Sequence, residues 1–281
     1  MNINKLKTSA SSGLMRLVFL LVTAIVVIPI AWAIISSFKT SAEYLTDPWA
    51  LPQSLQWQNY VNAFQKANMG DYLLNSVMIT VGSMALLFVF GIPAAYALSR
   101  FRFVGSRLLN LAVLAGLFIN TSYIVVPLFL QLKDMHALDN RAMLCVVYAA
   151  ETLPFSIYLL SGFMKSISRE YEEAARIDGC GYFSTMLRIV LPMCKPGIIT
   201  VAMFNFMSYW NEYTLALTLL STPEKRTLSV GLKNLMEMQR YATDWGAMFA
   251  GLVIVMLPTM IFYALVQNKL TSGITIGGIK G

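Results

Sequence analysis

Six stretches of the chain are nearly free of charge, and each is long enough to cross a bilayer. A transmembrane helix needs about 20 consecutive, mostly apolar residues. Glu151 in the fourth stretch and Glu212 in the fifth are the only acids among these segments, and no stretch alternates with the period of a barrel strand. The pattern therefore predicts an all-α membrane protein with six transmembrane helices, at about 15–38, 72–99, 108–132, 142–164, 196–220 and 245–268.

The composition supports the same conclusion. Of the 281 residues, 57% are hydrophobic and 12% are charged, whereas ordinary soluble domains carry about 25% charged residues. Such a chain has too few charges to cover a water-exposed surface, so we expect lipid to surround most of it. No repeat or shift in composition marks a boundary, which predicts a single transmembrane domain over residues 1–281.

The first stretch allows two interpretations. Lys5 and Lys7 precede it, and Ala31-Trp32-Ala33 resembles the cleavage site of a secretory signal peptide. The apolar run nevertheless continues as far as Phe38, beyond the usual length of a signal peptide's apolar region. Its length favours an uncleaved first helix.

The distribution of lysine and arginine predicts the orientation. With the N-terminus inside, the inner segments hold 13 of these residues and the outer segments hold eight. Cytoplasmic loops carry such an excess, so we expect both termini on the cytoplasmic side. In a membrane chain, the formal net charge of +7 favours anionic lipid as the partner and not nucleic acid.

One predicted inner segment, residues 165–195, has the signals of ordered helices and not those of a simple connecting loop. Ser168 is a suitable N-cap, Glu172 and Arg176 are spaced as a helical ion pair, and Gly179 and Gly181 are placed to end the helix. A second amphipathic stretch follows over residues 182–190. The segment therefore reads as a helix-turn-helix lying on the inner side of the membrane.

Two roles for this segment are open from its residues alone. Ala175 and Gly179 lie one turn apart and leave a face with little side chain, beside a stripe formed by Glu173 and Ile177. Such a helix could insert into a groove of a partner protein. It could equally rest on the lipid surface as an interfacial amphipathic helix.

The same residues resemble a known motif. Glu173-Ala174-Ala175, three residues, Gly179, nine residues and then Ile189-x-Leu191-Pro192 match the EAA loop of bacterial ABC importer permeases. In that family the loop forms a coupling helix that seats in a cleft of the ATP-hydrolysing subunit. The resemblance implies that ATPase coupling rests on seven residues: Glu173, Ala174, Ala175, Ile177, Gly179, Leu191 and Pro192.

Other positions resemble the carbohydrate-importer branch, and within it the shorter six-helix permease of the maltose type. These positions are Ala94 to Arg100, Trp210-Asn211-Glu212, Leu270 to Gly273 and Gly278 to Gly281. Tyr213, where the family often has phenylalanine, and the apolar Ile274-Thr275-Ile276 depart from the pattern.

The resemblance implies a multi-pass subunit of the bacterial inner membrane with several partners. They are a second permease chain, a dimer of ATP-binding subunits and an extracytoplasmic sugar-binding protein. The chain has no Gly-x-x-x-x-Gly-Lys-Ser/Thr loop for phosphates. We therefore expect no cofactor and no catalysis in this chain, with ATP and Mg²⁺ held by the partner ATPases. The residues do not indicate which sugar is carried.

Polar residues within the predicted fifth span form a candidate translocation pathway. Asn205, Ser208, Tyr209 and Glu212 follow the spacing i, i+3, i+4, i+7, which places them on one helical face, and Asn211 flanks that face. Intramembrane acids such as Glu151 and Glu212 usually face a cavity or a partner. The face could line a pore for sugars, or it could supply hydrogen bonds between helices.

A secondary carrier competes with transport driven by ATP, and a metal site also has to be considered. Glu151 and Glu212 could serve as proton sites of an ion-coupled secondary carrier, although no inverted repeat is visible. His136 is the single histidine, and Cys145, Cys180 and Cys194 lack the spacing of a zinc site. We therefore expect no metal site.

Overall fold

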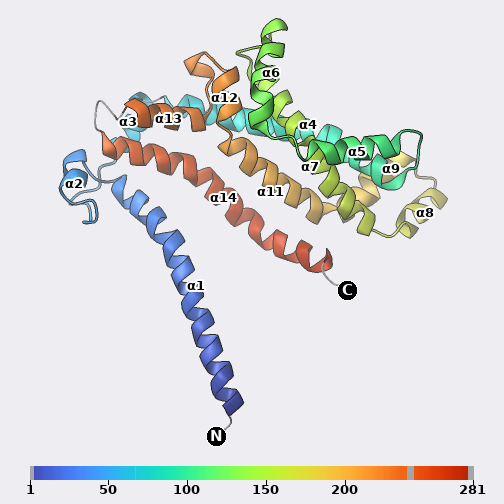
Figure 1. Cartoon of the computed structure of the whole chain (residues 1–281), viewed down its shortest axis with the longest axis horizontal. Coiled ribbons are helices and arrows are strands. Elements are labelled where there is room, and N and C mark those ends of the chain that lie inside the picture. Colours follow the sequence, from blue (N-terminus) through green and yellow to red (C-terminus); the bar gives the residue numbers. More distant parts are fainter. Residues whose placement is uncertain (1–2, 67, 239–243, 278–281) are drawn as a thin grey trace. The chain divides into compact units, whose positions relative to one another are not determined.

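The computed structural model describes the backbone of residues 3–66, 68–238 and 244–277, and the side chains of 13–65, 68–236 and 244–267. Every regular element in these ranges is helical (Figure 1), which confirms the predicted all-α class. The elements are α1 Ile3–Ser36, α2 Ser41–Thr46, α3 Gln58–Lys66, α4 Met69–Arg100, α5 Ser106–Gly116, α6 Thr121–Asp134, α7 Arg141–Ser166, α8 Glu170–Ile177, α9 Tyr182–Thr185, η1 Met186–Val190, α10 Leu191–Met193, α11 Lys195–Asn211, α12 Thr214–Leu219, η2 Pro223–Lys225, α13 Leu228–Met238 and α14 Trp245–Gly277.

Four helices of the described chain are continuous and apolar enough to cross a membrane. They cover Gly13–Ser36, Met69–Arg100, Arg141–Ser166 and Trp245–Gln267. Two further spans form only if each of two bent helix pairs counts as one, which gives the six predicted crossings. The second bent pair joins Tyr182–Met193 to Lys195–Asn211, so it begins before the predicted fifth span and ends within it. The exact bounds of the six crossings stay a prediction.

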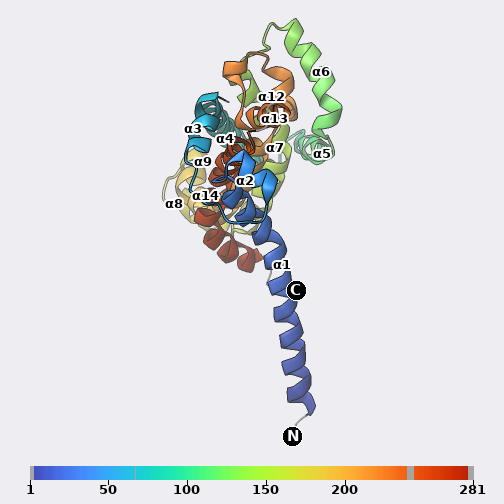
Figure 2. The same cartoon turned by 90° about the vertical axis from the view of Figure 1, so that its left-hand side faces the viewer.

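The third predicted span is broken between α5 and α6. The two helices meet at an angle of 106°, and Figure 2 shows α5 nearly end-on while α6 lies along the view plane. The amide group of Asn120 caps the second piece by accepting a hydrogen bond from the backbone N–H of Ser122. Gly116 ends the first piece where a Cβ would lie 2.6 Å from Pro154 Cγ, so its missing side chain lets α5 approach α7.

The fifth predicted span is also interrupted. Helix α11 ends at Asn211, Glu212 has an extended backbone with ψ of 130°, and α12 restarts at Thr214. A continuous helix over residues 196–220 is therefore wrong. The prolines within the spans do not cause the breaks, because Pro29, Pro93, Pro127, Pro154 and Pro258 all lie inside helices.

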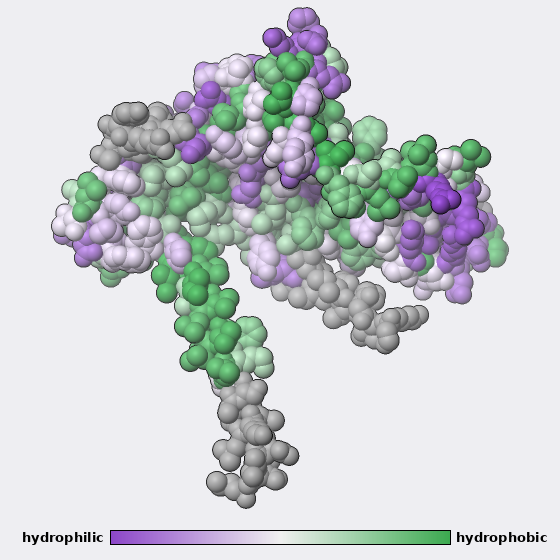
Figure 3. Space-filling view, in the orientation of Figure 1, coloured by the Kyte–Doolittle hydropathy of each residue, from purple (hydrophilic) through white to green (hydrophobic). Residues whose placement is uncertain are grey.

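The chain divides into two compact units, residues 1–69 with 232–256 and residues 70–231 with 257–281. The first unit contains an aromatic cluster in which Trp32 contacts the rings of Tyr44, Trp49 and Phe249 at centroid distances of 5.9, 5.5 and 5.2 Å. Large apolar side chains along α1 are exposed, and they form the green surface of this helix in Figure 3. A single folding domain over the whole chain stays a prediction.

Buried hydrogen bonds hold the segment after α1 in the first unit. Asn59 Nδ2 donates to the carbonyl oxygens of Ser37 and Lys39, both at 2.8 Å. The ammonium group of Lys39 is buried and donates to the carbonyl oxygens of Asp47 and Pro48. Backbone carbonyls thus solvate a cation that has left water, as a buried charge requires.

Gly246 lies against this hydrogen-bonded corner, and we expect Gly246→Ala to destabilise it. The new Cβ would lie 2.6 Å from the carbonyl oxygen of Lys39 and would press on the Asn59 amide. Such overpacking costs about 1–3 kcal/mol. The measurement is the thermal unfolding midpoint in detergent, with Gly162→Ala as the control because a Cβ there meets nothing within 4 Å. Equal midpoints for wild type and Gly246→Ala would contradict the packing.

Helix α7 is central to the second unit because it contributes to both of its apolar clusters. One cluster includes Leu144 and Tyr148 with Ile79, Tyr209 and Leu215. The other includes Leu160 and Met164 together with residues of α4 and of η1. Because residues of η1 belong to the second cluster, the segment that follows α8 packs against α4 and α7.

A polar contact joins two loops of the second unit through Asp139. Its carboxylate accepts hydrogen bonds from Lys225 Nζ at 2.7 Å, from Thr222 Oγ1 at 2.6 Å and from the backbone N–H groups of Ser221 and Thr222. The hydrogen bond from Lys225, followed by those from Thr222, holds the pKa of Asp139 well below its usual value. The carboxylate therefore favours the folded loops when it is ionised.

Because this pKa is lowered on folding, its stabilising effect is complete above the ordinary aspartate pKa near 4 and is lost as the pH falls toward the lower folded value. We expect the unfolding midpoint of wild type to fall more steeply below about pH 4 than that of Asp139→Asn. The pair is partly exposed, so the difference at neutral pH is less than about 1 kcal/mol. Parallel pH profiles of the two proteins would exclude this role.

Candidate functional site

Helix α8 ends where its sequence predicts, but it begins at Glu170 with Arg169, and not Ser168, as the N-cap residue. The Glu170 N–H donates to Ser168 Oγ at 3.3 Å, and three acids occupy the first turn. At the other end the Cys180 N–H donates to the Ala175 carbonyl and the Gly179 N–H to the Arg176 carbonyl, at 2.8 and 3.0 Å. This pair of bonds is a Schellman motif, which needs a left-handed residue. Gly179 supplies it with φ of +83°, confirming that it ends the helix.

The two faces of α8 differ in character. Glu173, Ala174 and Ile177 are exposed, and Ile177 is 88% exposed although it is a large apolar side chain. Figure 3 shows hydrophilic residues gathered over α8 at one end of the second unit. On the other face Glu172 and Ala175 are buried within the chain itself. Of the seven predicted coupling residues, Ala175 is therefore covered by its own chain.

Glu172 has a different partner from the one its spacing predicts. Its Oε1 lies 2.6 Å from Arg100 Nε, and its Oε2 accepts a hydrogen bond from Tyr96 at 3.0 Å. The expected Glu172–Arg176 pair is wrong, because Glu172 points into the chain whereas Arg176 is exposed and lies over the ring of Tyr182, 4.9 Å from its centroid. Local spacing in the sequence could not predict this arrangement, because Arg100 and Tyr96 are distant from Glu172 in the chain.

The second half of the helix-turn-helix is irregular. After α9, five residues form the π-helix η1, whose Met186 and Val190 are buried in the cluster beneath. Helix α10 then carries Leu191, which is half-buried, and Pro192, which is exposed. A bend of 78° separates this segment from α11. π-Helical turns often mark functional positions because one residue is inserted into the regular ladder.

The polar residues of α11 separate into a buried and an exposed set. Asn205 is buried and its Nδ2 donates to Ser156 Oγ on α7 at 3.0 Å, while the hydroxyl of buried Tyr209 hydrogen-bonds that of Thr152. Ser208 and Asn211 are exposed. The interhelical hydrogen bonds that the sequence left open are therefore present, and only part of the predicted face is free of them.

Glu212 lies beyond the end of α11 and caps the helix that follows. Its carboxylate accepts hydrogen bonds from the N–H groups of Leu215 and Ala216, at 2.7 and 2.9 Å, and from the hydroxyl of Tyr148 at 2.6 Å. Free N–H groups at a helix start need such partners, above all where water is scarce. The acid that looked like a pore or proton site thus satisfies the backbone at the break between α11 and α12.

The residues of α7 that complete this polar cluster were missed from the sequence. Tyr148, Thr152 and Ser156 follow one another at four-residue spacing and contact Glu212, Tyr209 and Asn205 respectively. The spacing was a visible signal, since residues four apart share a helical face. We call these six residues the polar cluster.

Glu151 is not part of the polar cluster and has different neighbours. It accepts a hydrogen bond from the Thr121 hydroxyl at the start of α6. It also lines a mostly apolar pocket of about 440 Å³ between α6 and α7. The two intramembrane acids therefore have different hydrogen-bond partners.

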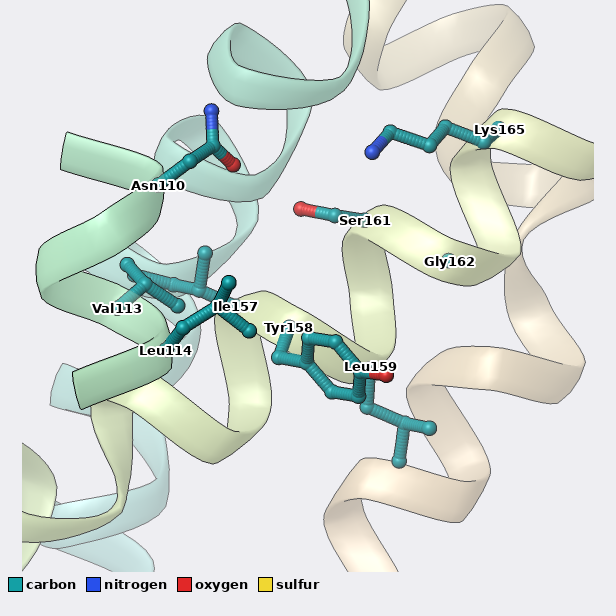
Figure 4. Close-up of a pocket in the computed structure, with 9 residues that line it drawn as sticks. All are labelled: Asn110, Val113, Leu114, Ile157, Tyr158, Leu159, Ser161, Gly162 and Lys165. Atoms are coloured by element: carbon teal, nitrogen blue, oxygen red, sulfur yellow. The ribbon is translucent and has the colours of Figure 1, made fainter. Parts of the chain in front are cut away.

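A second pocket, of about 470 Å³, lies between α5 and α7. Figure 4 shows Asn110, Ser161 and Lys165 around one part of it, with apolar side chains of both helices around the rest. None of the predicted site residues lines this pocket. Among the residues that the structure describes, no group of three or more metal-binding side chains occurs.

The residues from α4 to α14 that build these features match a described family. The model for the binding-protein-dependent transport system inner membrane component matches residues 87–272. The chain belongs to this family. The match includes α8, α11 and the polar cluster, while Gly278 to Gly281, part of the predicted resemblance, lie outside the described residues.

Relatives extend the match over nearly the whole permease. The chain is 36% identical over 258 residues to the diacetylchitobiose uptake system permease protein NgcG of Streptomyces coelicolor, covering 92% of this chain and 85% of the relative. It is 34% identical over 266 residues to the inner membrane ABC transporter permease protein YcjP of Escherichia coli, covering 94% and 93%.

A solved structure shares the fold. A chain of a bacterial ABC transporter involved in the import of the acidic polysaccharide alginate superposes with a TM-score of 0.78 and is 25% identical, covering 95% of this chain and 98% of its own. These likenesses place the permease among the membrane subunits of carbohydrate ABC importers. Such subunits are generally non-catalytic.

Proposed function

We propose that this permease is one of two membrane-spanning subunits of an ATP-driven importer for a sugar or oligosaccharide. The observation that carries the proposal is α8, a short helix with an exposed Glu173–Ala174–Ile177 surface and a buried anchor on its other face. We call this exposed surface the docking face. An exposed isoleucine beside an acid on a well-anchored helix suits insertion into a groove of a partner protein.

In this proposal both termini and α8 lie on the cytoplasmic side, as the excess of basic residues there favours. A dimer of ATP-binding subunits binds ATP and Mg²⁺ and receives the docking face. A second permease chain completes the pore, and an extracytoplasmic binding protein delivers the sugar. Closure of the ATPases would displace α8, and rigid-body motion would then change the side to which the pore opens.

Exposed Ser208 and Asn211, together with half-buried Glu212, are the proposed lining of the pathway, and buried Asn205 and Tyr209 hold α11 against α7 beside it. Amide, hydroxyl and carboxylate groups bind sugar hydroxyls, and aromatic rings pack against sugar faces. A saccharide cargo is supported by the diacetylchitobiose named for one relative and the alginate named for the solved transporter. In this chain Tyr209 stacks on Tyr148 with centroids 5.5 Å apart, so its ring is already packed within the cluster.

The test is reconstitution of the permease with its second permease chain and ATPases in proteoliposomes. We expect binding protein and a cognate member of a labelled sugar panel to give uptake that requires ATP inside the vesicles. Uptake driven by a pH gradient without ATPases would instead favour the secondary carrier based on Glu151 and Glu212. ATP hydrolysis that no sugar and no binding protein stimulates would contradict the proposed import.

A further inference from the structure

A buried polar junction joins three parts of the second unit near the end of α4. Arg100 Nε lies 2.6 Å from Glu172 Oε1 of α8, and Arg100 Nη2 donates to the carbonyl oxygen of Ile167, just after α7, at 3.0 Å. Tyr96, one turn earlier on α4, donates to the other carboxylate oxygen of Glu172 at 3.0 Å. One guanidinium and one carboxylate therefore bind α4, α8 and the end of α7 to one another.

This junction is shielded from water. The side chains of Arg100 and Glu172 are 4% and 5% exposed, and Tyr96 is buried beside them. Loss of one partner from a buried ion pair leaves an uncompensated charge and is strongly destabilising. The contact between Arg100 Nε and Glu172 Oε1 is an ion pair without hydrogen-bond geometry, whereas the hydrogen bond from Arg100 Nη2 to Ile167 fixes the orientation of the planar guanidinium. Such a contact transmits displacement better than a surface pair, whose long side chains can reorient.

Apolar packing continues the connection on both sides of α8. Tyr96 belongs to the apolar cluster that also holds Leu160 and Met164 of α7 and Val190 of η1. The ring of Tyr96 meets that of Phe101 edge to face at 5.6 Å, and Phe101 meets Tyr182 of α9 at 5.3 Å. The segments before and after the α8 turn therefore rest on the same end of α4.

We propose that Tyr96, Arg100 and Glu172 are positioning residues that convert a displacement of α8 into movement of α4. The inference rests on the proposed function, because it needs a partner that moves α8. It goes further by naming α4, and not only the chain that directly follows α8, as the helix that receives the motion. The docking face binds the ATPase, and the buried junction on the opposite face of α8 transmits its displacement to α4.

Two conservative variants test the role. Glu172→Gln keeps the shape of the side chain but removes the charge that faces Arg100, and Tyr96→Phe removes a single hydroxyl. The readout is sugar transported per ATP hydrolysed in proteoliposomes, measured beside ATPase binding and complex assembly. Allosteric couplings are typically worth about 5- to 150-fold, and we expect about a tenfold lower ratio for Glu172→Gln and a smaller loss for Tyr96→Phe.

Assembly separates this proposal from the proposed function. Both variants should bind the ATPases as wild type does, because neither side chain lies on the docking face. Arg102→Gln, an exposed arginine two residues beyond Arg100, is the matched control and should leave the ratio unchanged. A wild-type transport ratio in Tyr96→Phe and in any assembled Glu172→Gln complex would overturn the junction. It would leave ATP-driven import itself intact.

A double variant covers the case in which Glu172→Gln does not fold. Arg100→Met with Glu172→Leu replaces both charges by apolar groups of similar volume, an exchange that often restores stability. An assembled double variant that hydrolyses ATP but transports little sugar supports the junction. Normal transport by the double variant would show that apolar packing alone links α8 to the membrane helices.

Discussion

Ile177→Asp is expected to abolish ATP-driven uptake while the permease remains folded. Ile177 is 88% exposed, so a charge at this position costs the isolated chain little. In a partner's groove the same carboxylate would be desolvated without a counter-charge. Truncation of a hot-spot residue at the centre of an interface costs about 2 kcal/mol or more. A loss of 2 kcal/mol weakens binding about 30-fold.

The measurements are co-purification of the ATPases with the permease and sugar uptake by the reconstituted complex. Val104→Asp is the matched control, because Val104 is an equally exposed apolar residue in the loop between α4 and α5. It should retain both ATPase binding and uptake. If Ile177→Asp also retained both, α8 would not be the docking helix, and the lipid-bound interpretation of its sequence would be favoured.

Gly179→Arg would be a less clear test of the same idea. A Cβ at Gly179 meets nothing within 4 Å, so space is not the restriction. The backbone has φ of +83°, which L side chains rarely adopt, and a substitution would strain the end of α8 as well as enlarge its surface. A loss of uptake could then arise from misfolding of the turn. Ile177 changes only the chemistry of the exposed face.

The sequence predicted the end of α8, and its start to within one residue, because both depend on local chemistry. A short polar start, a first turn of acids and a glycine stop act within a few residues of one another. The partner of Glu172 could not be predicted in this way, since Arg100 is 72 positions away and Arg176 offers an equally suitable charge at helical spacing. Tertiary packing chose between them by burying Glu172.

The breaks in the third and fifth spans were missed for a related reason. Hydropathy measures only whether a segment is apolar enough for lipid, and both segments are. The prolines, which are the usual signals for a break, lie inside helices, whereas the breaks occur beside Asn120 and Glu212. Each of these side chains accepts hydrogen bonds from the N–H groups of the new helix. A capping residue inside an apolar run was thus the informative signal.

Glu212→Ala is expected to destabilise the permease by about 2–4 kcal/mol. The substitution removes the cap from two backbone N–H groups and leaves the Tyr148 hydroxyl without its carboxylate acceptor. Loss of a cap costs about 0.5–2 kcal/mol, and each buried polar group left unsatisfied costs about 1–3 kcal/mol. The measurement is the unfolding midpoint of the purified complex in detergent. Asn211→Ala is the control, because Asn211 is exposed and donates to the Met207 carbonyl of its own helix.

Comparing these variants distinguishes a role in stability from a role in sugar transport. Tyr148→Phe removes one hydrogen bond and keeps the cap of α12, so it should lose less stability than Glu212→Ala. If the exposed residues beside the cluster contact sugar, Asn211→Ala will lower uptake at unchanged ATPase binding and with a small change in midpoint. If uptake follows the unfolding midpoint across all three variants, the cluster only holds α7, α11 and α12 together. Glu212 would then act as the cap that permits a broken helix inside the membrane.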